Sequence, residues 1–168
     1  AARPAPTCPD FSDGQTVYLW GESRRLRLEP AARGRNAFLR DQDIVLQVHP
    51  SDTPAQRQAL LNSFYRAQLD ARIRACLPYW EGKTGLHPAS VQIKNMKTRW
   101  GTCNTAAKRI WLNLQLVKQP PVCLDYVLAH ELTHLLHPDH GNGFWAFLLR
   151  VMPDCKAVRK ALNETPFL

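Results

Sequence analysis

The sequence lacks several features that would assign it to a familiar class of protein. No stretch reaches the roughly 18 consecutive apolar residues that a membrane-spanning helix requires, because Asp, His or Arg interrupts the longer apolar segments. The first residues contain no apolar core of a secretory signal. These absences predict a soluble protein that has no membrane partner. A leader that has been removed stays open, because the chain does not begin with methionine.

The sequence also lacks any C-x-x-C pair, which argues against a zinc ribbon or a dithiol redox site. Its cysteines are odd in number and widely spaced: Cys8, Cys76, Cys103, Cys123 and Cys155. Such cysteines are typical of reduced thiols in a cytoplasmic protein, and this is the location that we expect.

Acidic residues are absent between Glu81 and Asp125, although the whole chain has a formal charge of +8. Seven basic residues lie in this interval: Lys83, Lys94, Lys97, Arg99, Lys108, Arg109 and Lys118. A second basic cluster lies between Arg24 and Arg40. Such fields attract polyanions, including nucleic acid. A solvated basic surface explains them equally well, and the sequence leaves both readings open.

The length of 168 residues and a hydrophobic content of 45% predict one domain with one core. Residues 1–10 carry three prolines and read as a flexible lead-in. Residues 11–168 are expected to form a single monomeric domain, with a β-rich part over residues 11–50 and a helical part over residues 53–168.

Periodicity predicts the elements in the first half of the chain. Short β-rich runs at residues 16–20, 26–28 and 44–48 predict a small, antiparallel sheet. Thr53 followed by Pro54 is a helix start. Leu61, Tyr65, Leu69, Ile73 and Leu77 then place one apolar stripe along a helix that Pro78 is expected to end.

In the second half, residues 91–94 and 110–116 alternate like strands with one buried face, with a hairpin connection at residues 104–108. Pro120 and Pro121 open a helix over residues 122–137, which Pro138 stops. Further helices are expected at residues 144–151 and 157–162. The predicted fold class is α+β, with a small mixed or antiparallel sheet packed over the helix of residues 122–137 and additional helices.

An H-E-x-x-H motif lies in that helix, at His130, Glu131 and His134. Residues four apart on a helix differ by about 40° of rotation, so both imidazoles project toward one point and suit one metal ion. A catalytic zinc site takes three protein ligands and leaves one position open. His140 is the favoured third ligand, because the proline break lets the chain turn back, whereas His137 follows His134 on the same helical end.

Glu131 is rotated too far from His130 to be a ligand beside it but can reach water on the ion, which suits a general base. The helix has apolar sides that we expect to be buried around the metal: Val127, Leu128, Leu132, Leu135 and Leu136. H-E-x-x-H also occurs by chance on amphipathic helices. The helical context and the following His140 favour the metal site.

Residues 91–150 contain the segments KTRWGTC (97–103), IWLN (110–113), DYVLAHELTHL (125–135) and DHG (139–141), followed by Phe144 and Trp145. By these segments the chain resembles the YgjP-like metallopeptidase domain, a zincin family related to the SprT-like and WLM proteases. Family members usually read R-W-G-S-C, N-H-S and H-E-L-A-H. The chain therefore departs from the family pattern at Thr102, Thr133, Asp139 and Gly141, and no departure removes a ligand or the base.

The resemblance implies a zincin fold with His130, His134 and His140 as zinc ligands and Glu131 as the base. It also marks Arg99, Trp100, Cys103 and Asn113. Arg99 either binds a substrate anion or forms a structural ion pair. Asn113 is a candidate for orienting a backbone, and packing is the favoured role of Trp100 and Cys103.

The function expected from the sequence is a zinc metallopeptidase in which a zinc-bound water attacks a peptide bond of a peptide or protein substrate. Tyr126, His137 and Arg99 are candidates for stabilising the oxyanion, and the strand at residues 109–116 is a candidate sheet edge for aligning a peptide. The alternatives are hydrolysis of a nucleotide or other phosphoanhydride, and a DNA-associated protease of the SprT or WLM type.

Overall fold

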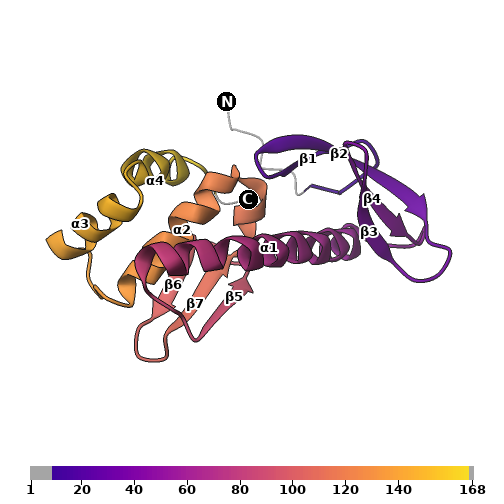
Figure 1. The fold of residues 1–168 in the computed structure, drawn as a ribbon. Helices are drawn as coiled ribbons and strands as arrows, with labels where there is room; N and C mark the ends of the chain where they lie inside the picture. The colour runs from indigo at the N-terminus through magenta and orange to yellow at the C-terminus, as the bar shows by residue number, and fades with distance from the viewer. Residues whose placement is uncertain (1–8, 167–168) are drawn as a thin grey trace. The chain divides into compact units, whose positions relative to one another are not determined.

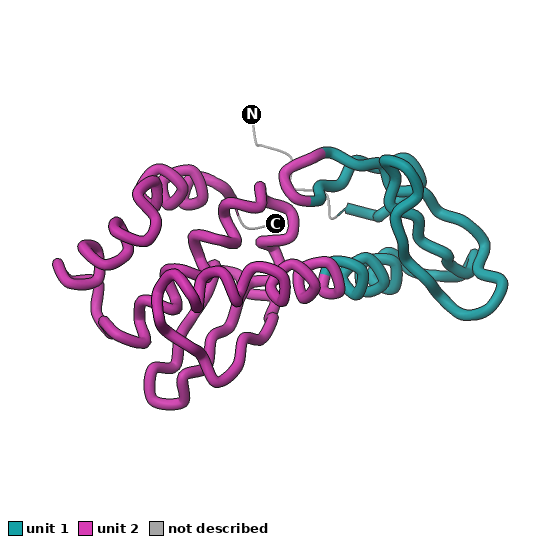
Figure 2. The backbone as a smooth tube through the Cα atoms, in the orientation of Figure 1, with its two compact units in different colours: residues 1–19, 23–65 teal, residues 20–22, 66–168 magenta. Residues whose placement is uncertain are grey.

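The structure is a computed structural model that describes residues 9–166. It divides into two compact units, the first with residues up to 19 and 23–65, the second with residues 20–22 and 66–168 (Figure 2). The predicted flexible lead-in at residues 1–10 falls almost wholly outside the described residues, as does Cys8.

The first unit contains a four-stranded sheet in the order β1-β2-β4-β3 (Figure 1). Its strands are β1 (Thr16–Leu19), β2 (Glu22–Pro30), β3 (Asn36–Arg40) and β4 (Asp43–Val48). Strands β3 and β4 form an antiparallel pair, but β2 and β4 pair in parallel, with Leu26 opposite Ile44. The prediction of an antiparallel sheet is therefore wrong. The sequence analysis missed β3, which lies between β2 and β4 in the sequence and pairs antiparallel with β4, so that β4 runs in the same direction as β2.

Helix α1 (Pro54–Thr84) begins where Thr53 predicted it. Thr53 and Gln56 form a reciprocal capping box, in which each backbone N–H donates to the other's side chain, at 2.8 and 3.2 Å. The helix continues past Pro78, so the predicted end at that residue is wrong. Proline removes one backbone hydrogen bond, and the buried Trp80 holds the next turn by donating to the Asp125 carboxylate at 2.9 Å.

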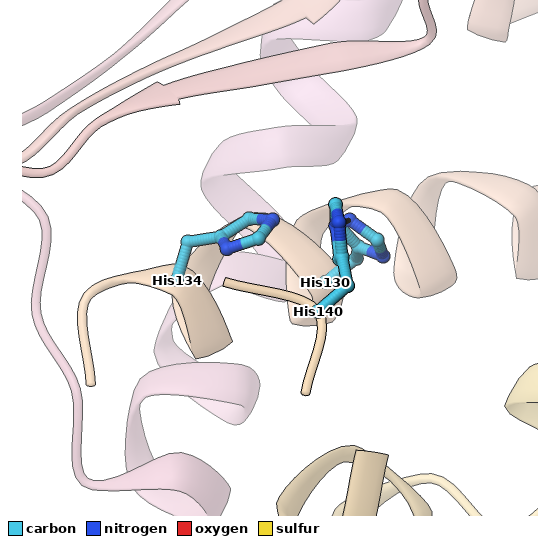
Figure 3. A group of neighbouring side chains, drawn as sticks. All are labelled: His130, His134 and His140. Carbon is cyan, nitrogen blue, oxygen red and sulfur yellow. Dashed lines mark hydrogen bonds between the residues drawn. The ribbon is translucent and has the colours of Figure 1, made fainter. Parts of the chain in front are cut away.

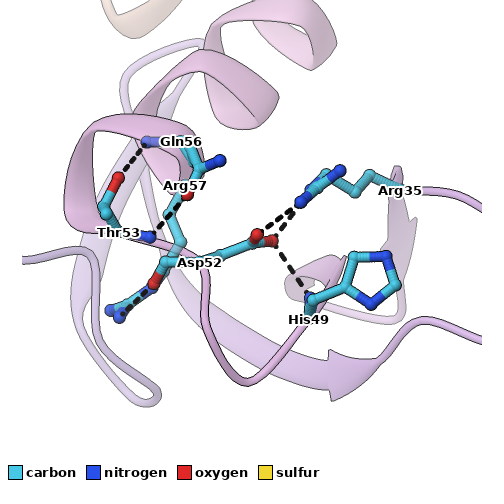
Figure 4. Close-up of polar contacts among 6 residues, drawn as sticks. All are labelled: Arg35, His49, Asp52, Thr53, Gln56 and Arg57. Carbon is cyan, nitrogen blue, oxygen red and sulfur yellow. Dashed lines mark hydrogen bonds and ion pairs between the residues drawn. The ribbon is translucent and has the colours of Figure 1, made fainter.

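The junction of β4 and α1 is organised around the carboxylate of Asp52 (Figure 4). Asp52 is 5% exposed, and it accepts two hydrogen bonds from the Arg35 guanidinium, at 2.5 and 2.9 Å. It also accepts one from the His49 backbone at 3.0 Å. The hydrogen bonds from Arg35, followed by that from His49, lower the pKa of Asp52 to about 2. A buried carboxylate with three donors is stabilised as the anion.

The second unit contains a three-stranded sheet in the order β5-β7-β6. Strand β5 (Ser90–Lys94) lies parallel to β7 (Arg109–Asn113), and β6 (Gly101–Asn104) forms the antiparallel hairpin with β7. The sequence analysis missed β6, which begins with glycine and is otherwise mostly polar. Strand β7 is therefore the centre of this sheet, and the expectation that it forms an edge is wrong.

Strand β7 ends at Asn113, and residues Leu114–Lys118 form a 3-10 helix, η1, instead of continuing the predicted strand. The side chain of Asn113 explains this change. Its oxygen accepts a hydrogen bond from the Gln115 backbone at 3.0 Å, which caps the first turn of η1. Leu114 and Leu116 are buried like Leu112 of β7, but they lie in η1, so the alternation continues beyond Asn113 without an extended backbone.

Helix α2 (Pro121–His134) lies between this sheet and the helices α3 (Asn142–Val151) and α4 (Cys155–Asn163) (Figure 1). It contacts β6 and β7 on one side and α3 and α4 on the other. Leu128, Ala129 and Leu132 are fully buried. Leu136, expected on a buried side, is 51% exposed because the helix ends at His134 and a turn follows.

The α+β fold class predicted from the sequence is confirmed, since the described residues combine two small mixed sheets with four α-helices. No helix within residues 9–166 combines the length and the apolar character needed to cross a bilayer.

We expect Asp52→Asn to lower the urea midpoint of unfolding at pH 7, because it removes the charge that Arg35 binds. The pKa of Asp52 is held at about 2, below its ordinary 3.8, so its charge stabilises the fold above about pH 4 and this contribution is lost on acidification. The difference between wild type and variant should therefore shrink from pH 5 toward pH 2.

The matched control is Asp41→Asn, at an exposed turn residue with a φ of 54°, a conformation that Asn tolerates. It should leave the midpoint almost unchanged. Equal midpoints for wild type and Asp52→Asn at pH 7 would contradict this account of the junction.

Candidate metal centre

Helix α2 brings the two histidines of the H-E-x-x-H motif to one face. The ring centroids of His130 and His134 lie 5.0 Å apart. His130 is half-buried and His134 is 9% exposed at the last residue of the helix. The arrangement follows from the i, i+4 spacing, which puts both side chains on one side one turn apart.

His140 comes from the loop between α2 and α3 and completes a group of three (Figure 3). Its Nε2 atom lies 3.2 Å from Nε2 of His130, and its ring centroid lies 4.6 Å from that of His134. One possible ligand atom from each of the three residues lies within 4.8 Å of the others. The loop turns back because the Gly141 backbone donates to the Asp139 carboxylate at 2.9 Å, a local Asx turn.

His137, the competing third ligand, does not belong to this group. Its ring lies near Gly143 and Phe147, with a centroid distance of 6.0 Å to the Phe147 ring. Its contribution to the site is a backbone carbonyl, which accepts a hydrogen bond from Nδ1 of His134 at 3.1 Å.

These Nδ1 contacts orient the imidazoles. A carbonyl only accepts, so Nδ1 of His134 carries the proton and its Nε2 keeps a free lone pair. The hydroxyl of Tyr126, a buried residue of α2, lies 3.2 Å from Nδ1 of His130. Such partners on the second ring nitrogen are typical of histidines that bind metals. Tyr126 is therefore engaged with His130, and this contact competes with the suggested oxyanion role.

The surroundings keep the imidazoles of His130 and His134 neutral, as metal ligands must be. Burial, with smaller effects of His134, His140 and Arg159, lowers the pKa of His130 to about 3. Burial also lowers the pKa of His134. A divalent cation would therefore meet the nitrogen donors of His130 and His134 without displacing protons from them.

The donor set fits zinc. A tetrahedral zinc ion with Zn–N distances of about 2.1 Å has its nitrogen ligands about 3.4 Å apart. The Nε2 atoms of His130 and His140 lie at 3.2 Å, close to this separation. Three imidazoles, with no fourth donor in the group among residues 9–166, also match the open coordination of catalytic zinc sites.

Glu131 lies beside the group but is not one of its members. It is 5% exposed, and burial raises the pKa of its carboxyl to about 8, with Arg99 opposing the change. Strand β6 covers it closely at Gly101, where an added Cβ would lie 3.2 Å from Oε1 of Glu131 and 2.7 Å from Cγ1 of Val127. The glycine of the RWGTC segment is therefore needed for the close approach of β6 to α2.

A cavity of about 520 Å³ opens in front of Glu131 and the three histidines. Strand β6 contributes Gly101, Thr102 and Cys103 to its lining. Helix α4 contributes Arg159. Among the residues that line it, Glu131 is the only carboxyl group, within residues 9–166. The positively charged side chains that line the cavity are those of Arg99 and Arg159, so a bound molecule would meet more positive than negative charge.

The other marked residues have distinct positions. Arg99 is exposed and lines the cavity, and it forms no ion pair with a carboxylate of residues 9–166. Of the seven basic residues between Glu81 and Asp125, it is the one that lines this cavity. Trp100 and Cys103 also line it, and burial raises the pKa of the Cys103 thiol to about 11.

Asn113 holds the loop that carries Arg99. It is fully buried, and its amide donates to the carbonyls of Met96 and Arg99 at 3.0 and 2.7 Å. Its side-chain oxygen accepts from the Met96 backbone at 3.2 Å. The backbone that Asn113 orients is therefore that of the protein itself, and a role toward a substrate backbone stays a prediction.

Two residues near the histidines were missed by the sequence analysis, Lys156 and Arg159, whereas Trp145 beside them was named there only as part of the family resemblance. Lys156 and Arg159 share a helix face at i, i+3 spacing, and this spacing is the only signal that the sequence contains. Solvated basic residues on an amphipathic helix show the same pattern, so nothing in it pointed to the site.

The chain is similar to a family of metallopeptidases and, in fold, to solved metallopeptidase structures. A family model described as YgjP-like, metallopeptidase domain matches residues 1–165. No curated protein matches the chain. The crystal structure of the metallopeptidase zymogen abylysin of Pyrococcus abyssi is similar, with a TM-score of 0.50 and 22% identity over 54% of this chain and 90% of that one.

The crystal structure of the metallopeptidase zymogen jannalysin of Methanocaldococcus jannaschii gives a TM-score of 0.49 and 20% identity, over 55% of this chain and 88% of that one. At these identities the likeness concerns the fold alone.

We expect Gly101→Ala to destabilise the protein by about 1–3 kcal/mol, the usual cost of overpacking, because the new methyl group would meet Val127 and Glu131. Urea unfolding measures the change. The control is Gly82→Ala in α1, where an added Cβ meets nothing within 4 Å. It should stabilise the helix by about 0.5–1 kcal/mol. Equal stability of Gly101→Ala and wild type would show that β6 does not approach α2 this closely.

Proposed function

The chain belongs to the YgjP-like metallopeptidase family, and from this premise we propose that zinc is its metal, bound by His130, His134 and His140, and that Glu131 is its general base. Family membership makes the chain a metal-dependent peptidase. The observation that carries the finer assignment is the group of three imidazoles within 4.8 Å, beside a buried carboxyl in the same cavity.

Zinc bound here would supply a Lewis acid that lowers the pKa of water to about 7 and polarises a peptide carbonyl. Burial raises the pKa of Glu131 to about 8, and a cation beside the carboxyl would lower this pKa and favour the carboxylate. As the carboxylate, Glu131 would take the proton of the attacking water and deliver it to the leaving amine. Its position supports both steps, because it is buried at the base of the cavity and has no ion-pair partner of its own among the described residues.

Strand β6 is the proposed guide for the substrate backbone. It is an edge strand, and Gly101, Thr102 and Cys103 line the cavity. On an edge strand, alternate backbone N–H and C=O groups point away from the paired neighbour and are free to bind an extended peptide. A peptide added to this edge would run over the metal-binding face of α2.

We also propose a cytoplasmic location, supported by the free thiols of Cys76, Cys103, Cys123 and Cys155. Cys123 and Cys155 are buried and burial raises the pKa of both, which suits structural thiols in a reducing compartment.

Metal binding is tested by two substitutions of neighbouring histidines. We expect His140→Ala to weaken zinc binding by at least about 100-fold, because it removes one of three donors. His137→Ala should bind zinc like the wild type, since the role of His137 uses its backbone carbonyl. Competition with a chromophoric chelator measures both affinities. Loss of zinc from His137→Ala together with retention by His140→Ala would reverse the ligand assignment.

The role of the base is tested with Glu131→Gln, which keeps the size of the side chain. We expect this variant to retain zinc and to lose at least about 100-fold in kcat/KM on an unstructured protein, as removal of a general base typically does. Glu164→Gln, at an exposed residue of the described chain, is the matched control and should remain fully active. Undiminished cleavage by Glu131→Gln would end the assignment.

A panel of nucleoside triphosphates, assayed for phosphate release with the same zinc-loaded protein, tests the competing substrate class. Zinc-dependent phosphate release that requires Glu131, without any peptide cleavage, would replace the peptidase proposal by phosphoanhydride hydrolysis.

A further inference from the structure

A second hollow of about 520 Å³ lies beside the histidines, on the side of α3 and α4. Five residues line it: His130, His140, Trp145, Lys156 and Arg159. It therefore borders two of the three imidazoles directly. Arg159 also lines the cavity in front of Glu131, so this side chain belongs to the walls of both spaces.

The two cations of this hollow are held by an aromatic ring. The Arg159 guanidinium lies 5.2 Å from the centroid of the Trp145 ring, and the Lys156 ammonium lies 5.8 Å from it. The Trp145 ring in turn lies 6.4 Å from the His130 ring. Cation–π contacts of this kind restrict long side chains without neutralising their charge.

Neither cation has an anionic partner in the described chain. No ion pair within residues 9–166 includes Lys156 or Arg159, and no carboxylate lines the hollow. Two like charges three residues apart on one helix repel each other. Their position beside the reaction centre is favourable when a bound molecule supplies the opposite charge.

We propose that Arg159 and Lys156 form a subsite for a carboxylate of the peptide substrate, next to the bond that is cleaved, and so give the enzyme a preference for acidic substrates. This inference rests on the proposed peptidase function. A guanidinium binds a carboxylate through two parallel hydrogen bonds, and an ammonium adds a third donor. The carboxylate belongs either to an Asp or Glu side chain or to the free C-terminus of the substrate.

The experiment compares quenched fluorescent peptides of one sequence, with Glu or Gln beside the scissile bond and with a free or amidated C-terminus. For one of the two pairs, Glu against Gln or free against amidated C-terminus, we expect the wild type to cleave the acidic peptide with a kcat/KM about tenfold higher than that of its neutral counterpart. Arg159→Gln should abolish this preference. Loss of the Glu preference identifies a side-chain carboxylate, and loss of the free-acid preference identifies the C-terminus.

Lys160→Gln is the matched control, because Lys160 is an exposed basic residue of the same helix that lines neither space. It should keep the preference of the wild type. Equal kcat/KM for acidic and neutral peptides in the wild type would overturn the proposal, as would a loss of preference in Lys160→Gln as large as that in Arg159→Gln.

A binding measurement separates this proposal from the peptidase function. Glu131→Gln and the double variant Glu131→Gln/Arg159→Gln are titrated with the same peptides and with inorganic triphosphate, with and without zinc. Tighter binding of the acidic peptide that depends on Arg159 supports the subsite even when no peptide is cleaved. Arg159-dependent binding of triphosphate that exceeds binding of every peptide overturns the carboxylate assignment.

Discussion

The burial of helix α2 on two sides is the constraint on which the metal centre depends. The sheet covers one side through β6 and β7, and α3 and α4 cover the other. Fully buried residues such as Leu128 and Leu132 leave the helix no freedom to rotate. The directions of His130 and His134 are therefore set by core packing, and the turn after His134 only has to deliver one further imidazole.

The part of the candidate metal centre that could be predicted from the sequence is the part that depends on residue spacing within one helix. The i, i+4 histidines and the adjacent Glu131 follow from helical geometry, and the structure places all of them on α2. The preference for His140 over His137 rested on the need for convergence from another direction, and His140 does lie in the group of three. The capping residue Thr53 and the apolar stripe of α1 likewise follow from local rules.

The features that escaped prediction depend on contacts between distant segments. Strand β6 has little apolar patterning, and its position comes from pairing with β7 and from the space that Gly101 leaves over α2. Helix α1 continues through Pro78 because a tryptophan in the next turn is held from α2. Strand β7 stops at Asn113 because its side-chain oxygen caps η1, while its amide binds the loop before β6. The position of Lys156 and Arg159 also escaped prediction, since these residues of α4 come close to His130 only in the folded chain.

The three histidines differ in their contact with solvent. His134 is buried and His130 half-buried, but His140 is exposed and is supplied by a short loop shaped by the Asx turn at Asp139. For a cation bound by this group, entry and departure would pass the His140 side, and small movements of that loop would control the rate of metal exchange. Chelators should then remove the ion quickly even if its equilibrium affinity is high.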